Sequence, residues 1–257
     1  MNEFLKIKTI YGIPEIYEGD SLDKVIFKAI EDCKFKINEG DIFCIAQKIV
    51  SKSEGCIVDL NKVEPSNQAR QYAKKLNKDP RKIQVILNES KSVIRSFKHK
   101  GNNEGVIICE HKLGFISANA GVDESNIEGY EKVLTLPENP DASAKHIKKN
   151  LERLFGVRLG VIITDTFGRP WRIGQVNVAI GLSGVPATLK EQGNFDNHGK
   201  RLMVTEPAFA DEIAAASGLM MKKSKKTPVI LFQGLHWTSE NSVASELLRT
   251  EKEDMFR

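Results

Sequence analysis

The chain has 257 residues, of which 40% are hydrophobic and 28% are charged, with a formal net charge of +4 at pH 7. This composition is typical of an ordinary soluble globular protein that is long enough to bury a full core. The modest positive charge favours anionic small molecules and is too small to indicate a nucleic-acid partner. No apolar run approaches the roughly 18 residues of a membrane span, and the first residues lack the apolar region of a signal peptide, so we expect a cytoplasmic protein with no membrane partner.

Cysteine and histidine spacing argues against a zinc site. The four cysteines (Cys33, Cys44, Cys56 and Cys109) contain no C-x-x-C pair, and the five histidines show no mutual metal-ligand spacing. We therefore expect buried, reduced thiols and neither a disulfide framework nor a zinc-dependent fold.

The first quarter of the chain predicts a strand, a turn, a helix and a second strand. Residues 4–11 are mixed apolar, residues 12–15 (GIPE) form a turn, and Asp20 or Ser21 can cap a helix that runs to Cys33 with apolar residues at three- and four-residue steps. The apolar run 42–46 predicts a buried strand. Polar residues follow directly at its exit: Gln47, Lys48, Ser51 and Lys52.

The middle of the chain predicts three helices and more strands. Ser66 caps a helix to about Leu76, and Asp79 followed by Pro80 begins another, since proline is tolerated at the first helical position. Residues 106–120 are strand-like. A later helix, capped by Asp141 or Ser143, ends at Gly156.

The last third predicts strands on both sides of an alanine-rich helix. An apolar run from 161 to 164 ends on Asp165, and a strand is expected over 202–205. Pro207 begins a helix to about residue 221, and residues 229–232 form another strand. The segment 242–257 reads as a charged amphipathic tail.

The stretch AGVDESN places carboxylate, hydroxyl and amide groups close together. Asp123 to Asn126 follow a glycine that permits a sharp turn. Oxygen ligands packed so closely suit a hard divalent cation such as Mg²⁺ or Mn²⁺. A surface turn is the alternative interpretation, because the same residue types are common in turns.

The stretch DTFGRPWR is a second candidate. Asp165 at the expected strand end can hold a metal, with the hydroxyl of Thr166 beside it, and Arg169 and Arg172 can grip phosphate or carboxylate oxygens. The alternative is a capping aspartate with arginines paired to surface acids. If Asp123 and Asp165 share a metal centre, two ions could offset the charge of a nucleotide triphosphate.

The anion-binding residues near the N-terminus do not form a standard nucleotide motif. Gly12 to Glu15 permit a close approach of the backbone to a ligand, and Gln47 and Lys52 offer an amide and an ammonium group. Neither G-x-x-x-x-G-K-[ST] nor a G-x-G-x-x-G after a strand occurs, which excludes a P-loop and the usual dinucleotide fingerprint.

Together these blocks resemble the coenzyme F420-0:L-glutamate ligase (F420 gamma-glutamyl ligase) family. The resemblance is carried by GIPEIYEGD, AQKIVSKSEG, ANAGVDESN, IITDTFGRPWR, VTEPAFADEIAAA and the ending EKEDMFR, in the expected order over nearly the whole chain. The blocks AGVDESN and DTFGRPWR are specific, whereas the others are individually weak.

The resemblance implies an α+β fold of two closely connected domains, with mixed or antiparallel sheets, flanking helices and pairing into a homodimer. The sequence patterns alone leave an α/β fold equally open. We treat residues 1–257 as one unit and expect two subdomains whose boundary the sequence does not reveal. The resemblance also implies GTP-dependent attachment of L-glutamate to the carboxylate of F420-0, then γ-linked addition of further glutamate, through an acyl phosphate.

The family's site residues map onto this sequence residue by residue. The resemblance implies that Asp123, Asp165 and Thr166 hold Mg²⁺ or Mn²⁺, with two ions expected. It implies nucleotide binding by Gly12, Ile13, Pro14, Glu15, Gln47, Lys52 and Asn126. Arg169 and Arg172 are assigned to phosphate or substrate carboxylate on charge and geometry alone.

One departure from the family pattern follows the alanine-rich helix. Family members usually carry a glycine-rich loop there, often with an acidic or amide side chain, whereas this chain has lysines at 222, 223, 225 and 226. Lys222 and Lys223 could hold nucleotide phosphates directly. The lysines also leave two alternatives open: a related ligase acting on a different phosphorylated carboxylic acid, or a non-catalytic anion-binding homologue.

Overall fold

A five-stranded sheet forms the centre of the protein. The computed structural model describes residues 4–221, 226–238 and 241–254. The strand order is β1 (Lys6–Thr9), β10 (Val229–Gln233), β2 (Ile42–Ala46), β8 (Gly160–Arg169) and β9 (Arg172–Ser183). β2 and β8 run parallel, and every other neighbouring pair in this sheet is antiparallel. The sheet is therefore mixed.

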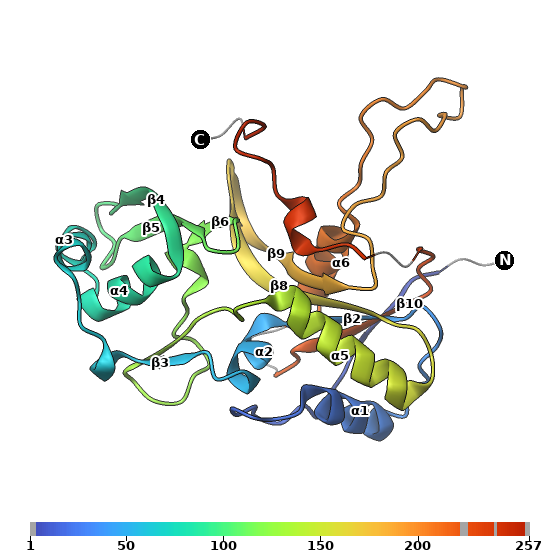
Figure 1. The fold of residues 1–257 in the computed structure, drawn as a ribbon, viewed down its shortest axis with the longest axis horizontal. Coiled ribbons are helices and arrows are strands. Elements are labelled where there is room, and N and C mark those ends of the chain that lie inside the picture. The colour runs from blue at the N-terminus through green and yellow to red at the C-terminus, as the bar shows by residue number, and fades with distance from the viewer. Residues whose placement is uncertain (1–3, 222–225, 239–240, 255–257) are drawn as a thin grey trace.

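Helices cover both faces of this sheet (Figure 1). α1 (Leu22–Cys33) and α5 (Pro140–Phe155) share one core cluster with Phe43 and Ile45 of β2. α6 (Phe209–Gly218) lies on the opposite face, where Ile42 and Cys44 are buried in a second cluster. Neighbouring residues of β2 thus point to opposite faces, as the two-residue period of a strand requires. The continuous apolar run of β2 is explained by this burial on both sides.

Residues 57–134 form smaller sheets around a third core cluster, at the left of Figure 1. The elements are β3 (Ile57–Asp59) paired with β7 (Lys132–Leu134), the sheet of β4 (Ser90–Phe97), β5 (Val106–His111) and β6 (Ile116–Ala118), and the helices α3 (Asn67–Leu76) and α4 (Pro80–Asn88). The mixed α+β class predicted from the sequence is confirmed. The division into two domains, and the single unit over 1–257, stay predictions.

Three of the predicted helix signals act as expected. The Ser66 hydroxyl accepts a hydrogen bond from the Ala69 N–H at 3.2 Å, and Asp79 accepts one from the Arg81 N–H at 2.8 Å. Gly156, in a left-handed conformation, ends α5. These caps satisfy backbone groups that a helix end would otherwise leave unpaired.

The predicted cap of α5 is wrong. Asn139 caps the helix by accepting a hydrogen bond from the Ala142 N–H at 3.0 Å, because Pro140 occupies the first helical position. Asp141 instead accepts from the Leu182 N–H of β9 at 2.8 Å and from the Ala244 N–H at 3.1 Å. Its carboxylate therefore joins α5, β9 and the C-terminal segment, which contains a short 3-10 turn (Ala244–Leu247).

Two further expectations differ from the structure, and one helix was not expected. β8 does not end at Asp165, because residues 165–169 find hydrogen-bonding partners on β9 and continue into a hairpin. Residues 202–205 are not a strand; they belong to a long connection before α6 in which a single bridge joins Phe195 to Arg201. The polar residues after β2 form a short helix, α2 (Gln47–Ser53), which the sequence analysis did not predict.

None of the helices in the described ranges combines the length and the apolar character needed to span a membrane.

Gly181 of β9 should be intolerant of a side chain. An added Cβ would lie 2.5 Å from the carbonyl carbon of Pro140, which is backbone and cannot move aside easily. We expect Gly181→Ala to lower the free energy of unfolding by about 1–3 kcal/mol, the usual cost of overpacking. Urea unfolding measures this change. Gly168→Ala is the matched control, since a Cβ there meets nothing within 4 Å, and an equal loss in both variants would contradict the packing argument.

Candidate functional site

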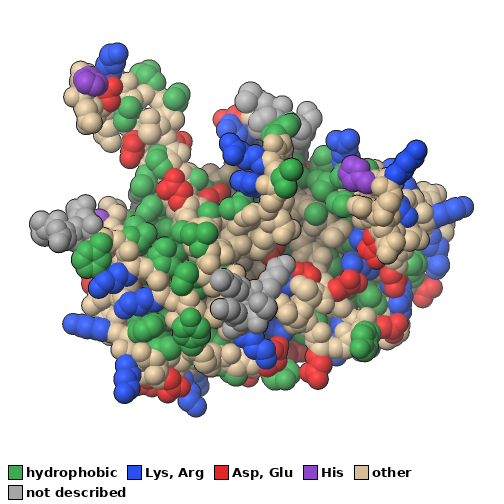
Figure 2. Space-filling view, turned by 180° about the vertical axis from the view of Figure 1, so that it is seen from behind, with side chains coloured by type: hydrophobic (Ala, Val, Ile, Leu, Met, Phe, Trp, Pro, Cys, Tyr) green, Lys and Arg blue, Asp and Glu red, His purple; other side chains and the backbone are tan. Residues whose placement is uncertain are grey.

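A cavity of about 870 Å³ opens where β2 ends. Ala46 pairs with Thr164 of β8, so the first turn of α2 and the middle of β8 lie side by side at this point. The cavity is visible as a hollow near the middle of the face shown in Figure 2. Segments from distant parts of the sequence line it: 13–16, 46–49 with Lys52, 126–128, 164–166, 175–177, 215–221 and 226–228.

Most of the residues predicted to bind nucleotide or metal gather in this cavity. Its lining includes Ile13, Pro14, Glu15, Gln47, Lys52, Asn126, Asp165 and Thr166. Gly12 and Asp123 lie next to the lining rather than in it. Lys222 and Lys223 fall outside the described residues. Arg169 and Arg172 lie at the exposed end of the β8–β9 hairpin, beyond the cavity.

The structure brings the two acidic segments together through α2. Lys48, which lines the cavity, places its Nζ 2.6 Å from Oδ2 of Asp123 and 3.1 Å from the carbonyl oxygen of Ser125. Burial acts to raise the pKa of Asp123, but hydrogen bonds from Lys48 and from the Ser125 N–H outweigh it, and the pKa lies below its ordinary value. Asp123 is therefore a carboxylate at neutral pH.

Asp165 has the opposite electrostatic character. Burial, together with the negative charge of Asp123, raises the pKa of Asp165 to about 6, although hydrogen bonds from the Thr166 N–H and the Gln47 side chain act to lower it. Ser51 donates to Oε1 of Gln47 at 2.8 Å, which leaves the Gln47 amide N–H₂ to donate to Asp165. A carboxylate destabilised by a neighbouring negative charge would be stabilised by an added cation.

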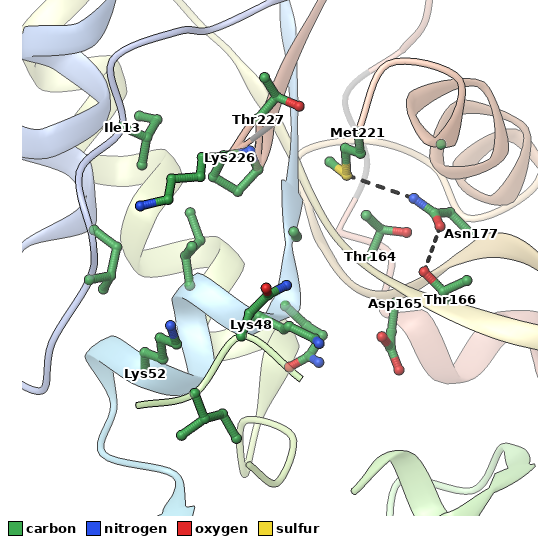
Figure 3. A pocket seen from close by; sticks show the side chains of 18 of the residues that line it. Ile13, Lys48, Lys52, Thr164, Asp165, Thr166, Asn177, Met221, Lys226 and Thr227 are labelled. Atoms are coloured by element: carbon green, nitrogen blue, oxygen red, sulfur yellow. Dashed lines mark hydrogen bonds between the residues drawn. The ribbon is translucent and has the colours of Figure 1, made fainter. Parts of the chain in front are cut away.

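Thr166 is oriented by a hydrogen-bond chain from α6. Its hydroxyl donates to Oδ1 of Asn177 at 2.9 Å (Figure 3). Nδ2 of Asn177 in turn donates to the Ser217 hydroxyl at 3.4 Å. Because the Thr166 proton is committed to Asn177, the lone pairs of its oxygen remain available as a ligand. Gly218 packs against Asn177, where an added Cβ would lie 3.3 Å from the amide carbon.

Lysine ammonium groups lie across the cavity from this polar chain. Figure 3 shows Lys52 and Lys226 on one side and Asp165, Thr166 and Asn177 on the other. Lys52 is buried and paired with Glu15. Its positive charge, with that of Lys48, makes this part of the cavity suited to phosphate oxygens.

The sequence analysis missed several lining residues. They are Lys48, Thr164, Gln175, Asn177, Lys226 and Thr227. Lys48 was noted among the polar residues after 42–46 but given no role, and its place in the block AQKIVSKSEG, between Gln47 and Lys52, was the signal that could have assigned it to the site. Asn177 has no such signal, because its role depends on the pairing of β9 with Thr166.

The available metal donors are oxygens. Across the described ranges, no three His, Cys, Asp or Glu side chains gather into a group that could hold an ion. The donor set at the cavity is instead the carboxylates of Asp123 and Asp165 with the Thr166 hydroxyl. Such a set fits a hard cation that keeps water or substrate oxygens as its other ligands, as Mg²⁺ usually does.

A cavity that combines ammonium groups with oriented carboxylates is typical of an enzyme that handles phosphorylated substrates. A family model described as F420-0:Gamma-glutamyl ligase matches residues 12–234 of the chain. The chain therefore belongs to the F420-0:gamma-glutamyl ligase family, and the family predicted from the sequence blocks is confirmed.

Curated relatives agree with this membership. The chain is 43% identical over 225 residues to the coenzyme F420:L-glutamate ligase of Methanocaldococcus jannaschii, covering 87% of each chain. It is 40% identical over 259 residues to the protein of the same name from Methanopyrus kandleri, covering 98% of each. A third relative with that name, from Methanothermobacter thermautotrophicus, is 37% identical over 252 residues, or 96% of this chain and 97% of its own.

Asp165 should lower the stability of the fold at neutral pH. Its pKa is about 6 in the folded protein against an ordinary value of 3.8, so its ionised form is disfavoured by folding. Asp165→Asn should therefore raise the free energy of unfolding by up to about 3 kcal/mol at a pH well above 6, since a difference of one pKa unit between the folded and unfolded states corresponds to about 1.4 kcal/mol. The gain should shrink as the pH falls through 6 and vanish below 3.8, where both states are protonated.

Urea unfolding of the two proteins between about pH 7.5 and about pH 5 measures this dependence. Asp79→Asn is the control of opposite sign, because the hydrogen bond from Arg81 holds the pKa of Asp79 below its ordinary value. That variant should lose stability at pH 7.5. A gain for Asp165→Asn that did not change with pH would remove the electrostatic explanation.

Proposed function

We propose that the chain is a GTP-dependent ligase that forms an amide bond between L-glutamate and the carboxylate of F420-0, followed by γ-linked addition of further glutamate. The proposal is supported by family membership and by the names of relatives that cover nearly the whole chain. The observation that carries it is the convergence of Lys48, Lys52, Asp165 and Thr166 on one cavity.

The reaction requires an activated carboxylate. A carboxylate is a poor acylating agent, so its oxygen attacks the γ-phosphorus of GTP, the bond to the β-phosphate oxygen breaks, and GDP leaves. The glutamate amine then attacks the acyl carbon, phosphate leaves with the bonding electrons, and the amine loses one proton as the amide forms. Positive charge placed at the phosphates stabilises both steps.

Lysines of the cavity suit the phosphate end of a nucleotide. Lys52 comes from α2, and Lys226 precedes β10 across the cavity. The backbone of residues 13–15 lines the same region, where proline and neighbouring side chains leave an apolar wall suited to a base or ribose. We infer that the nucleotide lies between these segments, with its γ-phosphate toward Asp165.

We also propose that Asp123, Asp165 and Thr166 bind Mg²⁺ or Mn²⁺, and that two ions bind, as the family resemblance implies. The cation would supply charge neutralisation for the phosphates. When no cation is bound, Lys48 neutralises Asp123. Cation binding would therefore replace the Lys48–Asp123 ion pair with a bond between Asp123 and the metal. Gln47 and the Thr166–Asn177 hydrogen bond hold the remaining ligands in place.

A direct assay tests the activity. GTP, Mn²⁺, glutamate and F420-0 are incubated with the protein, and phosphate release and product mass are followed together. We expect one phosphate for each glutamate added. Asp165→Asn should lower turnover by at least about a thousandfold, because an oriented charge at the reacting phosphate is lost, while the variant stays folded.

The outcomes of this assay separate the alternatives. Phosphate release only with a different phosphorylated acid would indicate the related ligase. No turnover with any acid, together with salt-sensitive binding of a polyanion, would indicate the non-catalytic homologue. Glu206→Gln, on the connection before α6, is a control that should retain wild-type rates. Wild-type rates in Asp165→Asn would remove the metal assignment.

We further propose that the protein pairs as a homodimer through the connection between β9 and α6. Residues 188–206 project from the main body as an arm in Figure 1. Phe195, Met203 and Val204 are exposed on it, and Val204 is 85% exposed. Clustered exposed apolar side chains on a projecting segment mark a protein contact.

Substitution on this arm tests the pairing. Val204→Asp should shift the sedimentation coefficient from that of a dimer toward that of a monomer, because a charge would be buried in the contact. Ile94→Asp, at an exposed position of β4, is the matched control and should leave the assembly unchanged. A wild-type protein that sediments as a monomer at all concentrations would contradict the proposal.

A further inference from the structure

Residues 124–131 contribute to the wall of the cavity but have little regular structure. The segment contains neither helix nor strand, and all of its residues except Ile127 are exposed. Asn126, Ile127 and Glu128 nevertheless line the cavity, shortly after Asp123 in the chain. Because so little apolar surface is buried within the segment, its position must depend on contacts with neighbouring elements.

Backbone hydrogen bonds fix the two ends of this segment. Asp123 donates its N–H to the carbonyl oxygen of Leu134 at 3.1 Å and accepts from the Leu134 N–H at 2.8 Å. At the other end, the carbonyl oxygen of Glu131 accepts from the Leu60 N–H at 2.8 Å. These bonds set where the segment begins and ends, and they leave the direction of its side chains to other contacts.

Two lysines from different cores hold adjacent residues at the start of the segment. Lys48 of α2 pairs with Asp123, and Lys82 of α4 places its Nζ 2.6 Å from Oε2 of Glu124. The apolar residues of α2 belong to the core of the central sheet, whereas those of α4 belong to the smaller core at the left of Figure 1. Consecutive side chains of an extended chain point to opposite sides. The carboxylate of Glu124 therefore faces α4, while that of Asp123 faces α2.

The Lys82–Glu124 ion pair is suited to act as a permanent tie. Lys82 is only 8% exposed, so its ammonium group has little contact with water. Movement of Glu124 away from it would leave a nearly buried charge unpaired, which is strongly unfavourable. The pair therefore restricts the backbone directly beside Asp123.

We propose that Lys82 is a positioning residue for the cation site and that it acts through Glu124. The inference rests on the proposed function, in which Asp123 binds Mg²⁺ or Mn²⁺. Cation binding would release Asp123 from Lys48, so the segment would lose this anchor when Asp123 must stay in place. The Lys82–Glu124 pair lies on the other side of the segment and is retained. It keeps Asp123 and the cavity wall of residues 126–128 oriented in the loaded protein, as partners behind metal ligands commonly do.

A second ion pair of the smaller core provides a matched control. Nζ of Lys78 lies 2.6 Å from Oε2 of Glu104, the same distance as in the Lys82–Glu124 pair. The lysine side chains are 6% and 10% exposed, and the glutamate side chains are 54% and 51% exposed. Neither Lys78 nor Glu104 lines the cavity. Loss of either pair should therefore cost similar stability, but only loss of the Lys82–Glu124 pair should change cation binding.

Binding of Mn²⁺ alone tests the inference without any turnover. Electron paramagnetic resonance of the free ion measures the dissociation constant, which Glu124→Gln should raise at least about tenfold, as is usual when a partner behind a metal ligand is removed. Glu104→Gln should change it by less than about twofold, since it removes an equal charge elsewhere. The two variants should unfold at similar urea concentrations. An equal loss of Mn²⁺ affinity in both would overturn the inference.

The sign of the charge change separates positioning from simple attraction. Lys82→Met removes a positive charge, which by attraction alone would tighten Mn²⁺ binding, whereas positioning predicts weaker binding by at least about tenfold, as in Glu124→Gln. The double variant should bind Mn²⁺ no more weakly than either single variant, because the two residues act as one unit. Wild-type or tighter binding in Lys82→Met would overturn the inference.

Glu124→Asp keeps the test decisive if Lys82→Met fails to fold. This variant preserves the charge at an exposed position, but its side chain is one methylene shorter and cannot reach Lys82 in the same geometry. Mn²⁺ binding should weaken in the same direction as in Glu124→Gln, because the tie rather than the charge is lost. An affinity equal to that of the wild-type protein would contradict the proposed role of Lys82.

The two proposals fail in different ways. If the wild-type protein forms no amide with F420-0, the proposed function fails, and the comparison of Mn²⁺ affinities still decides the role of Lys82. If the wild-type protein is active but Glu124→Gln and Lys82→Met bind Mn²⁺ normally, the positioning role alone is wrong. A wild-type protein that binds no Mn²⁺ would overturn the inference together with the metal assignment.

Discussion

Parallel pairing of β2 with β8 is the constraint on which the site depends. This pairing sets Ala46 opposite Thr164, so the chain leaves β2 and begins α2 beside the position where β8 presents Asp165. A shift of one residue would turn every side chain of β8 to the other face, placing Asp165 away from Gln47. The apolar residues that hold the register are buried on both faces of the sheet. Core packing therefore determines the geometry of the polar groups.

The charges of the cavity are balanced within the protein itself. Lys48 neutralises Asp123, Lys52 pairs with Glu15, and Asp165 has a raised pKa because burial and Asp123 both disfavour its ionised form. An arriving polyanion and its cation would replace these internal partners rather than enter an uncharged space. The internal ion pairs stabilise the folded protein when no ligand is bound. The unfavourable ionisation of Asp165 lowers that stability, and a bound cation would relieve it.

Much of the fold and part of the site could be predicted from sequence, for reasons that differ by element. The caps at Ser66 and Asp79 act through neighbouring backbone groups, so local pattern was sufficient. The extension of β8 beyond Asp165 could not be predicted, because its polar residues form a strand only through the partner β9. The same dependence explains why Asn177 was missed while Asp165 was found. The polar residues of Gln47–Ser53 were recognised in the sequence but their helix was not, since seven residues carry too little periodicity to distinguish a short helix from a loop.

The position of β10 in the sheet bears on how the chain acquires its structure during synthesis. β10 is made of residues 229–233, yet it lies between β1 and β2, which are separated from it by most of the sequence. β1 therefore has no neighbour in the sheet until nine-tenths of the chain has left the ribosome. Pairings of such sequence separation form slowly and leave strand edges unprotected meanwhile. The smaller core of residues 57–134 is built from nearer neighbours, so it can be complete while the central sheet still waits for its last strand.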